Sequence, residues 1–172
     1  MNTSPTFSAF HGDRLIATGS RDEVAAAARK VRGDASVLVF DNSTGMQIDL
    51  DPRDIDAHRS DEPRGRGRPK LGVVAREVTL LPRHWDWLAQ QPGGASVALR
   101  KLVEDASRSP KERARAAADA AYKFMHAIAG DRQGYEDALR ALFAGDRAKF
   151  TAQIASWPTD IRTYAMRLAF PE

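Results

Sequence analysis

The chain has 172 residues, of which 42% are hydrophobic and 28% charged, so it can form one domain or two small ones with a buried core. Its formal net charge of only +3 excludes a uniformly basic, histone-like coat, although it allows a local basic cluster. The lack of cysteine excludes disulfides and thiolate metal sites. No segment has the apolar length of a transmembrane helix or the pattern of a secretory signal, so we expect a soluble cytoplasmic protein.

The first part of the chain, residues 1–52, is predicted to form a small ββαββ layer. Ser20 precedes Glu23 by three residues, a capping-box arrangement that predicts a helix ending at Gly33. Short apolar runs on both sides of this helix, separated by turn-forming residues, predict two pairs of strands. The predicted strands are residues 6–10, 14–18, 36–40 and 46–50.

Residues 53–72 contain few hydrophobic side chains and several prolines, glycines and charges, a composition typical of a solvated linker. We therefore predict a domain boundary here. Within this linker, residues 64–70 hold four cations and no acid, which is the electrostatic pattern expected of a polyanion contact. These four cations are Arg64, Arg66, Arg68 and Lys70.

The run from Arg66 to Lys70, RGRPK, resembles the AT-hook, a short DNA-binding peptide with an arginine-glycine-arginine-proline core and basic flanks. Glycine lets the backbone sit deep in a narrow groove, proline keeps it extended, and arginines enter the negative potential of an A·T-rich minor groove. The resemblance implies that Arg66, Gly67 and Arg68 insert into the minor groove, with Arg64 and Lys70 on phosphates. The alternative is a linker in which the arginines serve only solubility.

Residues 73–108 are predicted to form a strand followed by two helices. The β-forming side chains stop at Pro82, which at a first-turn position predicts a helix closed by Gly93 and Gly94. Ser96 can cap the next helix, which has apolar residues at helical spacing. This stripe comprises Leu99, Leu102, Val103 and Ala106.

Residues 109–172 are predicted to form a compact helical bundle, which makes the whole chain α+β. Ser109, Pro110 and Glu112 combine an N-cap serine, a first-turn proline and a capping-box glutamate, and they predict a long helix to about Ala129. Three shorter helices with apolar stripes follow it. The predicted inner face of the long helix is Ala114, Ala117, Ala121, Phe124, Met125 and Ile128.

The stretch REVTLLPRHWDWLAQQPGGASVALRKLV, residues 76–103, resembles the ribbon-helix-helix family of bacterial DNA-binding proteins. The resemblance implies a homodimer in which residues 76–81 of two chains pair as an antiparallel ribbon in the major groove. Residues 82–91 and 93–106 would be the two helices, and amides at the N-terminus of the second, near Ser96, would bind phosphate. Expected secondary contacts with DNA are Arg76, Arg83, Arg100 and Lys101.

A second interpretation of residues 73–81 places them in the N-terminal sheet as a further strand. A base-reading ribbon needs polar side chains on its outer face, yet both faces of this segment carry a leucine. The two faces are Arg76, Val78 and Leu80, and Glu77, Thr79 and Leu81. We therefore keep both the dimer ribbon and the sheet strand as predictions.

The sequence does not support an enzyme, and we predict no cofactor. It contains neither a glycine-rich phosphate loop nor a serine nucleophile elbow. The four histidines lack zinc-site spacing, and the acidic residues 49–56 lack the glycine and final glutamate of a calcium loop, so we predict no metal site. Trp85 and Leu88 share one helix face, which we expect to pack in the core. Trp87 lies off this face, and if its side chain is exposed it would mark a partner interface.

Taken whole, the chain resembles an uncharacterised bacterial family, the domain of unknown function 2239, with the resemblance centred on residues 65–103. The resemblance implies bacterial origin and a shared architecture, but no activity. From the residues we predict a bacterial DNA-binding protein, nucleoid-associated or regulatory. The second hypothesis is a protein-interaction adaptor that uses the helical bundle and Trp87, with the basic segment only a tether.

Overall fold

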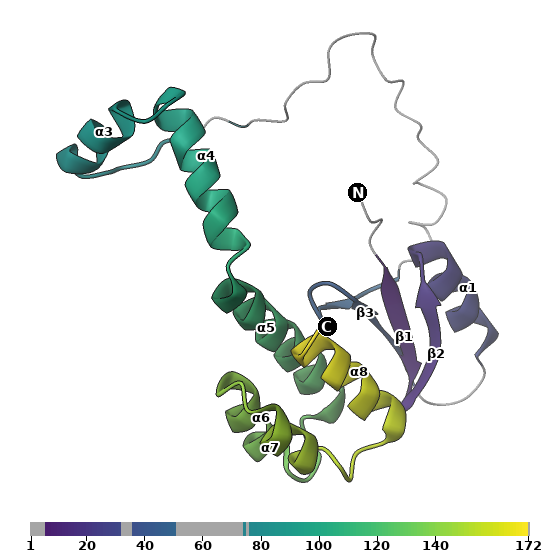
Figure 1. The fold of residues 1–172 in the computed structure, drawn as a ribbon. Helices are drawn as coiled ribbons and strands as arrows, with labels where there is room; N and C mark the ends of the chain where they lie inside the picture. Colours follow the sequence, from purple (N-terminus) through teal and green to yellow (C-terminus); the bar gives the residue numbers. More distant parts are fainter. Residues whose placement is uncertain (1–5, 32–35, 51–73, 75, 172) are drawn as a thin grey trace, which may run out of the picture. The chain divides into compact units, whose positions relative to one another are not determined.

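The computed structural model describes residues 6–31, 36–50, 74 and 76–171, which fall into two compact units. Unit 1 combines residues 1–56 with residues 110–172, and unit 2 comprises residues 57–109. The fold class is α+β, as the sequence predicts, with a small antiparallel sheet near the N-terminus followed by helices (Figure 1). None of the described helices is long and apolar enough to cross a bilayer.

Four antiparallel strands form the sheet of unit 1, in the order β2-β1-β3-β4. They are β1 (Phe7–His11), β2 (Arg14–Gly19), β3 (Val37–Asp41) and β4 (Gln47–Ile48). All four predicted strands are confirmed, although β4 is shorter than its sequence pattern indicates. Side chains alternate between the two faces of the sheet, so that each face has its own apolar layer.

Helix α1 (Arg21–Lys30) covers one face of the sheet, and its predicted capping box is present. The Glu23 carboxylate accepts a hydrogen bond from the Ser20 backbone N–H (2.8 Å), which lowers the pKa of Glu23 below its ordinary value. The helix ends at Lys30, and its predicted end at Gly33 lies outside the described residues. Val24 packs from this helix onto the sheet residues Ala9 and Val39.

The opposite face of the sheet packs against α5 (Pro110–Ala129) and α8 (Thr159–Ala169). The Phe40 and Phe124 ring centroids are 4.9 Å apart, and those of Phe10 and Tyr164 are 5.3 Å apart. All four side chains are nearly or fully buried. The sheet and the C-terminal helices therefore share one core, which the separate predicted segments 1–52 and 109–172 do not anticipate.

The remaining helices of unit 1 are α6 (Tyr135–Phe143) and α7 (Arg147–Gln153), which pack on each other beside α5 (Figure 1). Phe150 of α7 is fully buried, and the buried Trp157 donates its indole N–H to the Gln133 carbonyl oxygen (2.9 Å). The long helix begins at Pro110 and ends at Ala129, as predicted. Its predicted inner face is buried or half-buried except for Ala114, which is exposed.

Polar side chains also join the sheet to α8. The Asn42 side-chain oxygen accepts hydrogen bonds from the hydroxyls of Ser8 and Tyr164, each at 2.7 Å. Burial raises the pKa of the Tyr164 hydroxyl above its ordinary value, so this group remains a donor at neutral pH. The Asp160 carboxylate accepts a hydrogen bond from the Leu15 backbone N–H (2.9 Å). These bonds fix the position of α8 against β1 and β2.

Candidate nucleic-acid and dimer surface

Unit 2 contains the two helices predicted after the β-forming segment, α3 (Pro82–Ala89) and α4 (Gly94–Ser107). Pro82 occupies the first turn of α3, where its missing N–H costs nothing. Gly93 and Gly94 have φ of 85° and 75°, a region that L side chains rarely adopt, and this allows the sharp turn between the helices.

Ser96 does not cap α4, so this detail of the prediction is wrong. The N-cap is Gly93, which offers no side-chain hydrogen bond, and Ser96 lies within the first turn. The physical reason is the glycine pair, whose left-handed backbone lets the helix begin before the serine. The exposed Ser96 nevertheless lies at the helix end where backbone amides lack intrahelical partners.

Residues 76–81 belong to no strand in the single chain. The sheet of unit 1 consists of β1 to β4, so the described part of this segment does not extend it. The structure therefore does not bear out the interpretation of residues 73–81 as a further sheet strand. A ribbon formed by two chains stays a prediction.

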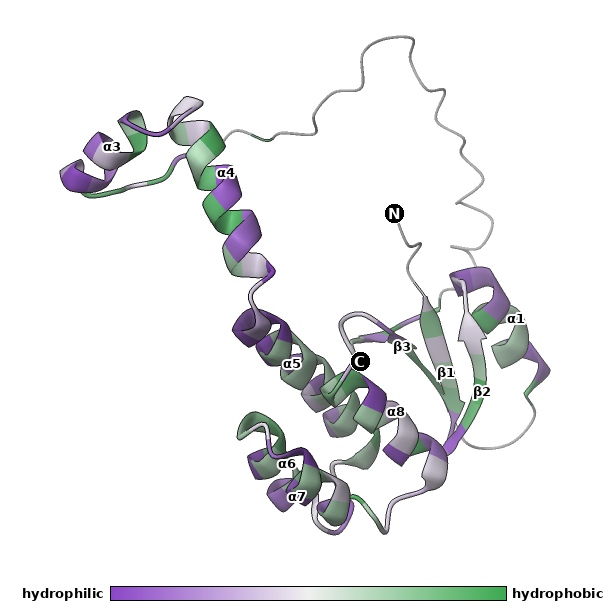
Figure 2. Ribbon diagram, in the orientation of Figure 1, coloured by the Kyte–Doolittle hydropathy of each residue, from purple (hydrophilic) through white to green (hydrophobic). Residues whose placement is uncertain are grey.

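Unit 2 buries little of its own apolar surface. Leu88 and Ala98 are its buried hydrophobic residues among those described. Hydrophobic residues also lie along both helices (Figure 2). The exposed large hydrophobic side chains are Val74, Val78, Leu81, Trp85, Trp87, Leu102 and Val103. Two helices with so small a core are marginal by themselves, so a further surface is needed to cover them.

The exposure of apolar side chains is clearest along the stripe of α4. The sequence pattern places Leu102 and Val103 on one apolar stripe, yet 48% of Leu102 and 65% of Val103 are exposed. Trp85, for which core packing is expected from its spacing with Leu88, is 41% exposed. The apolar residues therefore lie on helices at the predicted spacing, but the described part of unit 2 has no surface that buries them.

Four predicted contacts with DNA lie on unit 2 with their side chains in solvent: Arg76, Arg83, Arg100 and Lys101. None of them forms an ion pair within the described part of the chain. The structure brings Arg100 and Ser96 together, since the Arg100 Nε–H donates to the Ser96 carbonyl oxygen (3.1 Å). Arg76 precedes α3 and Arg83 lies in its first turn. Exposed, unpaired cations can release counterions when they meet phosphate.

The whole basic segment, residues 64–70, lies outside the described residues, and so does every residue of the AT-hook resemblance. Three aspartates of the acidic stretch 49–56 also lie outside them. The predicted site residues concerned are Arg64, Arg66, Gly67, Arg68 and Lys70, and the aspartates are Asp51, Asp54 and Asp56.

A family model described as "Uncharacterized protein conserved in bacteria (DUF2239)" matches residues 6–169. The chain belongs to this family. The match runs from β1 to the end of α8, so both units are part of the shared DUF2239 architecture. No curated protein and no solved structure matches the chain significantly. The predicted family is confirmed, whereas the AT-hook and ribbon-helix-helix resemblances rest on sequence pattern.

The Trp87 side chain on α3 is 49% exposed. Exposure of this side chain is what the interface prediction requires. Sequence reasoning missed a second feature of the structure, an open groove on unit 1 lined by Arg113 and Arg147, with Arg167 lining an adjoining hollow. These arginines come from three different helices, so no motif or helical spacing in the sequence could have grouped them.

Proposed function

We propose that the chain is a bacterial DNA-binding protein, nucleoid-associated or regulatory, that acts in the cytoplasm at the nucleoid. Residues 64–70 contact the minor groove and phosphates of an A·T-rich duplex, and unit 2 supplies further phosphate contacts and a dimer. Its role is binding rather than catalysis. No cofactor or metal enters this proposal.

The observation that supports the proposal best is the combination of solvent-exposed cations and uncovered apolar side chains on unit 2. Arg76, Arg83, Arg100 and Lys101 remain without a carboxylate partner among the described residues. They follow closely on a sequence segment with four cations in seven residues. Guanidinium and ammonium groups that have no internal partner are available to a polyanion.

A second copy of the chain is the partner that best fits the uncovered apolar side chains of unit 2. These side chains come from the segment before α3, from α3 itself and from α4. Pairing of residues 76–81 across a two-fold axis would satisfy their backbone groups and bring the same apolar residues of both copies together. The resulting homodimer would place two basic segments on one duplex.

A binding titration against salt tests the DNA proposal. We expect the affinity for an A·T-rich duplex to exceed that for G·C-rich and single-stranded DNA. The four cations in residues 64–70 alone are expected to contribute about −4 to the slope of log K against log salt for each chain bound, and the cations of unit 2 make the slope steeper. The measurement is fluorescence anisotropy of labelled DNA at several salt concentrations. A flat salt dependence, or equal affinity for the three DNAs, would contradict the proposal.

Replacing Val103 by glutamate is expected to dissociate the homodimer, because Val103 is 65% exposed in the single chain and would be covered by the second copy. A buried unpaired carboxylate is strongly unfavourable in an interface, whereas the same side chain in solvent costs little. Sedimentation velocity at micromolar concentration should give a dimer for the wild type and a monomer for Val103→Glu.

The matched control is Ala116→Glu, which adds the same charge at an exposed position of α5 in unit 1. This variant should remain dimeric. A wild-type chain that sediments as a monomer would remove the dimer from the proposal.

The exposed Trp87 supports a second candidate function, an adaptor that binds a protein partner through the helical bundle and this indole, with the basic segment as a tether. Half-exposed tryptophans are frequent anchors of protein interfaces. An apolar interface of this kind would bind almost equally at low and physiological salt, so the titration above separates the two functions.

A further inference from the structure

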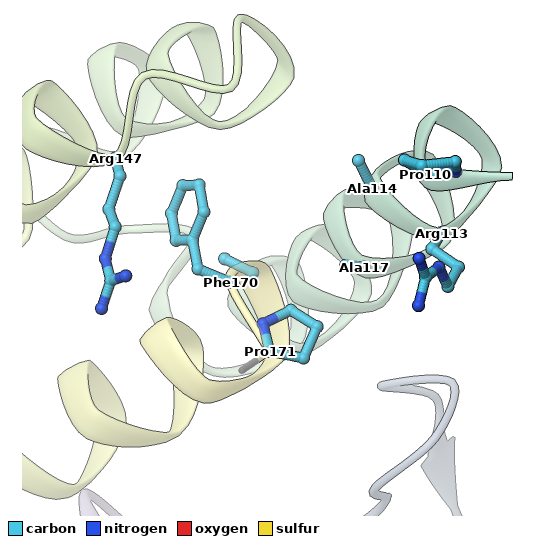
Figure 3. Close-up of a pocket in the computed structure, with 8 residues that line it drawn as sticks. Pro110, Arg113, Ala114, Ala117, Arg147, Phe170 and Pro171 are labelled. Atoms are coloured by element: carbon cyan, nitrogen blue, oxygen red, sulfur yellow. The ribbon is translucent and has the colours of Figure 1, made fainter.

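Unit 1 contains an open groove of about 660 Å³ between the N-terminal half of α5, the start of α7 and the end of α8 (Figure 3). This volume is in the range of ligand-binding clefts. None of the residues that line this groove is a residue of the proposed DNA or dimer surfaces. Its lining residues are Pro110, Arg113, Ala114, Ala117, Arg147, Ala169, Phe170 and Pro171.

The floor of the groove is apolar and firmly supported. The Phe170 ring packs at 5.6 Å, edge on, against the fully buried Phe150, and the Arg147 guanidinium lies 5.9 Å above it. On the other side lies Ala114, the one residue of the predicted inner face of α5 that stays exposed. The apolar stripe of α5 therefore continues past the core and ends in the groove, where no other described element of unit 1 covers it.

Arginines stand at both edges of this apolar floor. Figure 3 shows Arg147 and Arg113 on opposite sides, with Phe170 and Pro171 between them. A second hollow of about 400 Å³ shares Arg147, Phe170 and Pro171 with the groove and is also lined by Arg167. No aspartate or glutamate is among the described residues that line either part.

The charges of Arg113 and Arg147 are not neutralised by nearby acids of the described structure. Asp146 precedes Arg147 but is occupied, since it accepts a hydrogen bond from the Lys149 backbone N–H (3.0 Å) and pairs with the Lys149 ammonium (3.2 Å). Arg167 is engaged, because its guanidinium donates to the Asn42 side-chain oxygen (3.3 Å) and lies 4.6 Å from the Tyr164 ring centre. Arg147 has only its more distant contact with the Phe170 ring, so Arg113 and Arg147 are the cations of the groove that can bind an anion.

We propose that this groove docks a short acidic and apolar segment of a partner protein. Carboxylates of that segment bind Arg113 and Arg147, and an apolar side chain between them lies on Ala114 and Phe170. A guanidinium matches a carboxylate with two parallel hydrogen bonds, which gives the edges of the groove their selectivity. A nucleic-acid backbone offers charge but no apolar side chain for the floor, so the peptide is the better match. The protein would then join DNA, through unit 2, to a protein partner, through unit 1.

The experiment is selection of a phage-displayed random peptide library on the immobilised full-length protein, followed by titration of the enriched peptides. We expect the enriched sequences to carry at least two acidic residues around one apolar residue. Arg113→Ala and Arg147→Ala should each weaken an enriched peptide by at least about tenfold, because each removes a charge-assisted hydrogen-bonded pair. Ala114→Glu, an exposed substitution on a helix, should weaken it as well by repelling its carboxylates.

The matched control is Arg140→Ala, which removes an exposed arginine that pairs with Asp137 on α6, away from the groove. This variant should bind the peptide like the wild type, and all variants should show the thermal unfolding of the wild type. Enriched peptides without acidic residues, or peptides whose affinity does not depend on Arg113 and Arg147, would overturn the proposal, as would a selection without enrichment. Weaker binding of duplex DNA by the groove variants, with peptide affinity unchanged, would assign the groove to DNA instead.

Discussion

Replacing Arg66 and Arg68 together by alanine is expected to weaken binding to an A·T-rich duplex by roughly 30-fold or more, if each arginine contributes at least about 1 kcal/mol. Two guanidinium groups would leave the minor groove, where A·T-rich sequence concentrates negative potential. The slope of log K against log salt should also become less steep by about 2, one for each lost cation. Fluorescence anisotropy with the same labelled duplex measures both quantities.

The control for this pair is the double variant Arg108→Ala and Arg140→Ala. Both arginines are exposed and each already pairs with a carboxylate, of Glu104 and Asp137 respectively. The control removes the same net charge from positions that are already neutralised, so it should bind DNA almost like the wild type. Equal losses in the two double variants would mean that net charge, and not the basic segment, determines the affinity. The DNA-binding arm would then have to be abandoned.

Local signals in the sequence predicted the secondary structure well. The capping box at Ser20, the proline at position 110 and the apolar runs of the hairpin each act within a few residues, so their information is complete in the sequence. The elements of unit 1 accordingly lie near their predicted positions. Two exceptions lie in unit 2. The described part of residues 73–81 forms no strand in the single chain, and the backbone of Gly93 and Gly94 determined the start of α4 more strongly than the hydroxyl of Ser96.

Contacts between distant parts of the chain could not be predicted in the same way. An apolar stripe shows that a helix face is buried, but it does not say against which element. The sequence therefore predicts Phe10 and Phe124 in two separate segments, whereas in the structure their ring centroids are 5.4 Å apart in one core. For the same reason the apolar stripe of Leu102 and Val103 does not say which surface covers it, and the single chain leaves both side chains exposed.

The sequence indicates candidate site residues only where they lie close together along the chain. The basic residues 64–70 form a cluster in the sequence itself, and the exposure of Arg76, Arg83, Arg100 and Lys101 agrees with a contact surface. The groove of Arg113 and Arg147 exists only because α5, α7 and α8 meet in the folded chain. Arginines that come from three different helices have no fixed spacing in the sequence, so the sequence pattern could not group them into one site.

Replacing Gly45 by alanine is expected to destabilise unit 1 by roughly 3 kcal/mol or more, since it combines backbone strain with a severe overlap in a packed region. Gly45 lies in the loop between β3 and β4 with φ of 65°, where an L side chain is already strained. An added Cβ would lie only 1.9 Å from the Ala120 carbonyl oxygen and 2.6 Å from its carbon. These are backbone atoms of α5, so the overlap can be relieved only by moving the loop away from the helix.

Gly12→Ala is the matched control, because Gly12 has a similar φ of 56° while no atom lies within 4 Å of its added Cβ. It should lose only the backbone term, about 1 kcal/mol. Urea unfolding followed by circular dichroism gives the free energy of unfolding of both variants, and equal denaturant slopes keep the comparison valid. The difference between the two variants isolates the contact between the β3–β4 loop and α5, and therefore the core shared by the sheet and the helices. Losses of the same size at Gly12 and Gly45 would contradict that contact, and with it the assignment of residues 6–50 and 110–171 to a single folding unit.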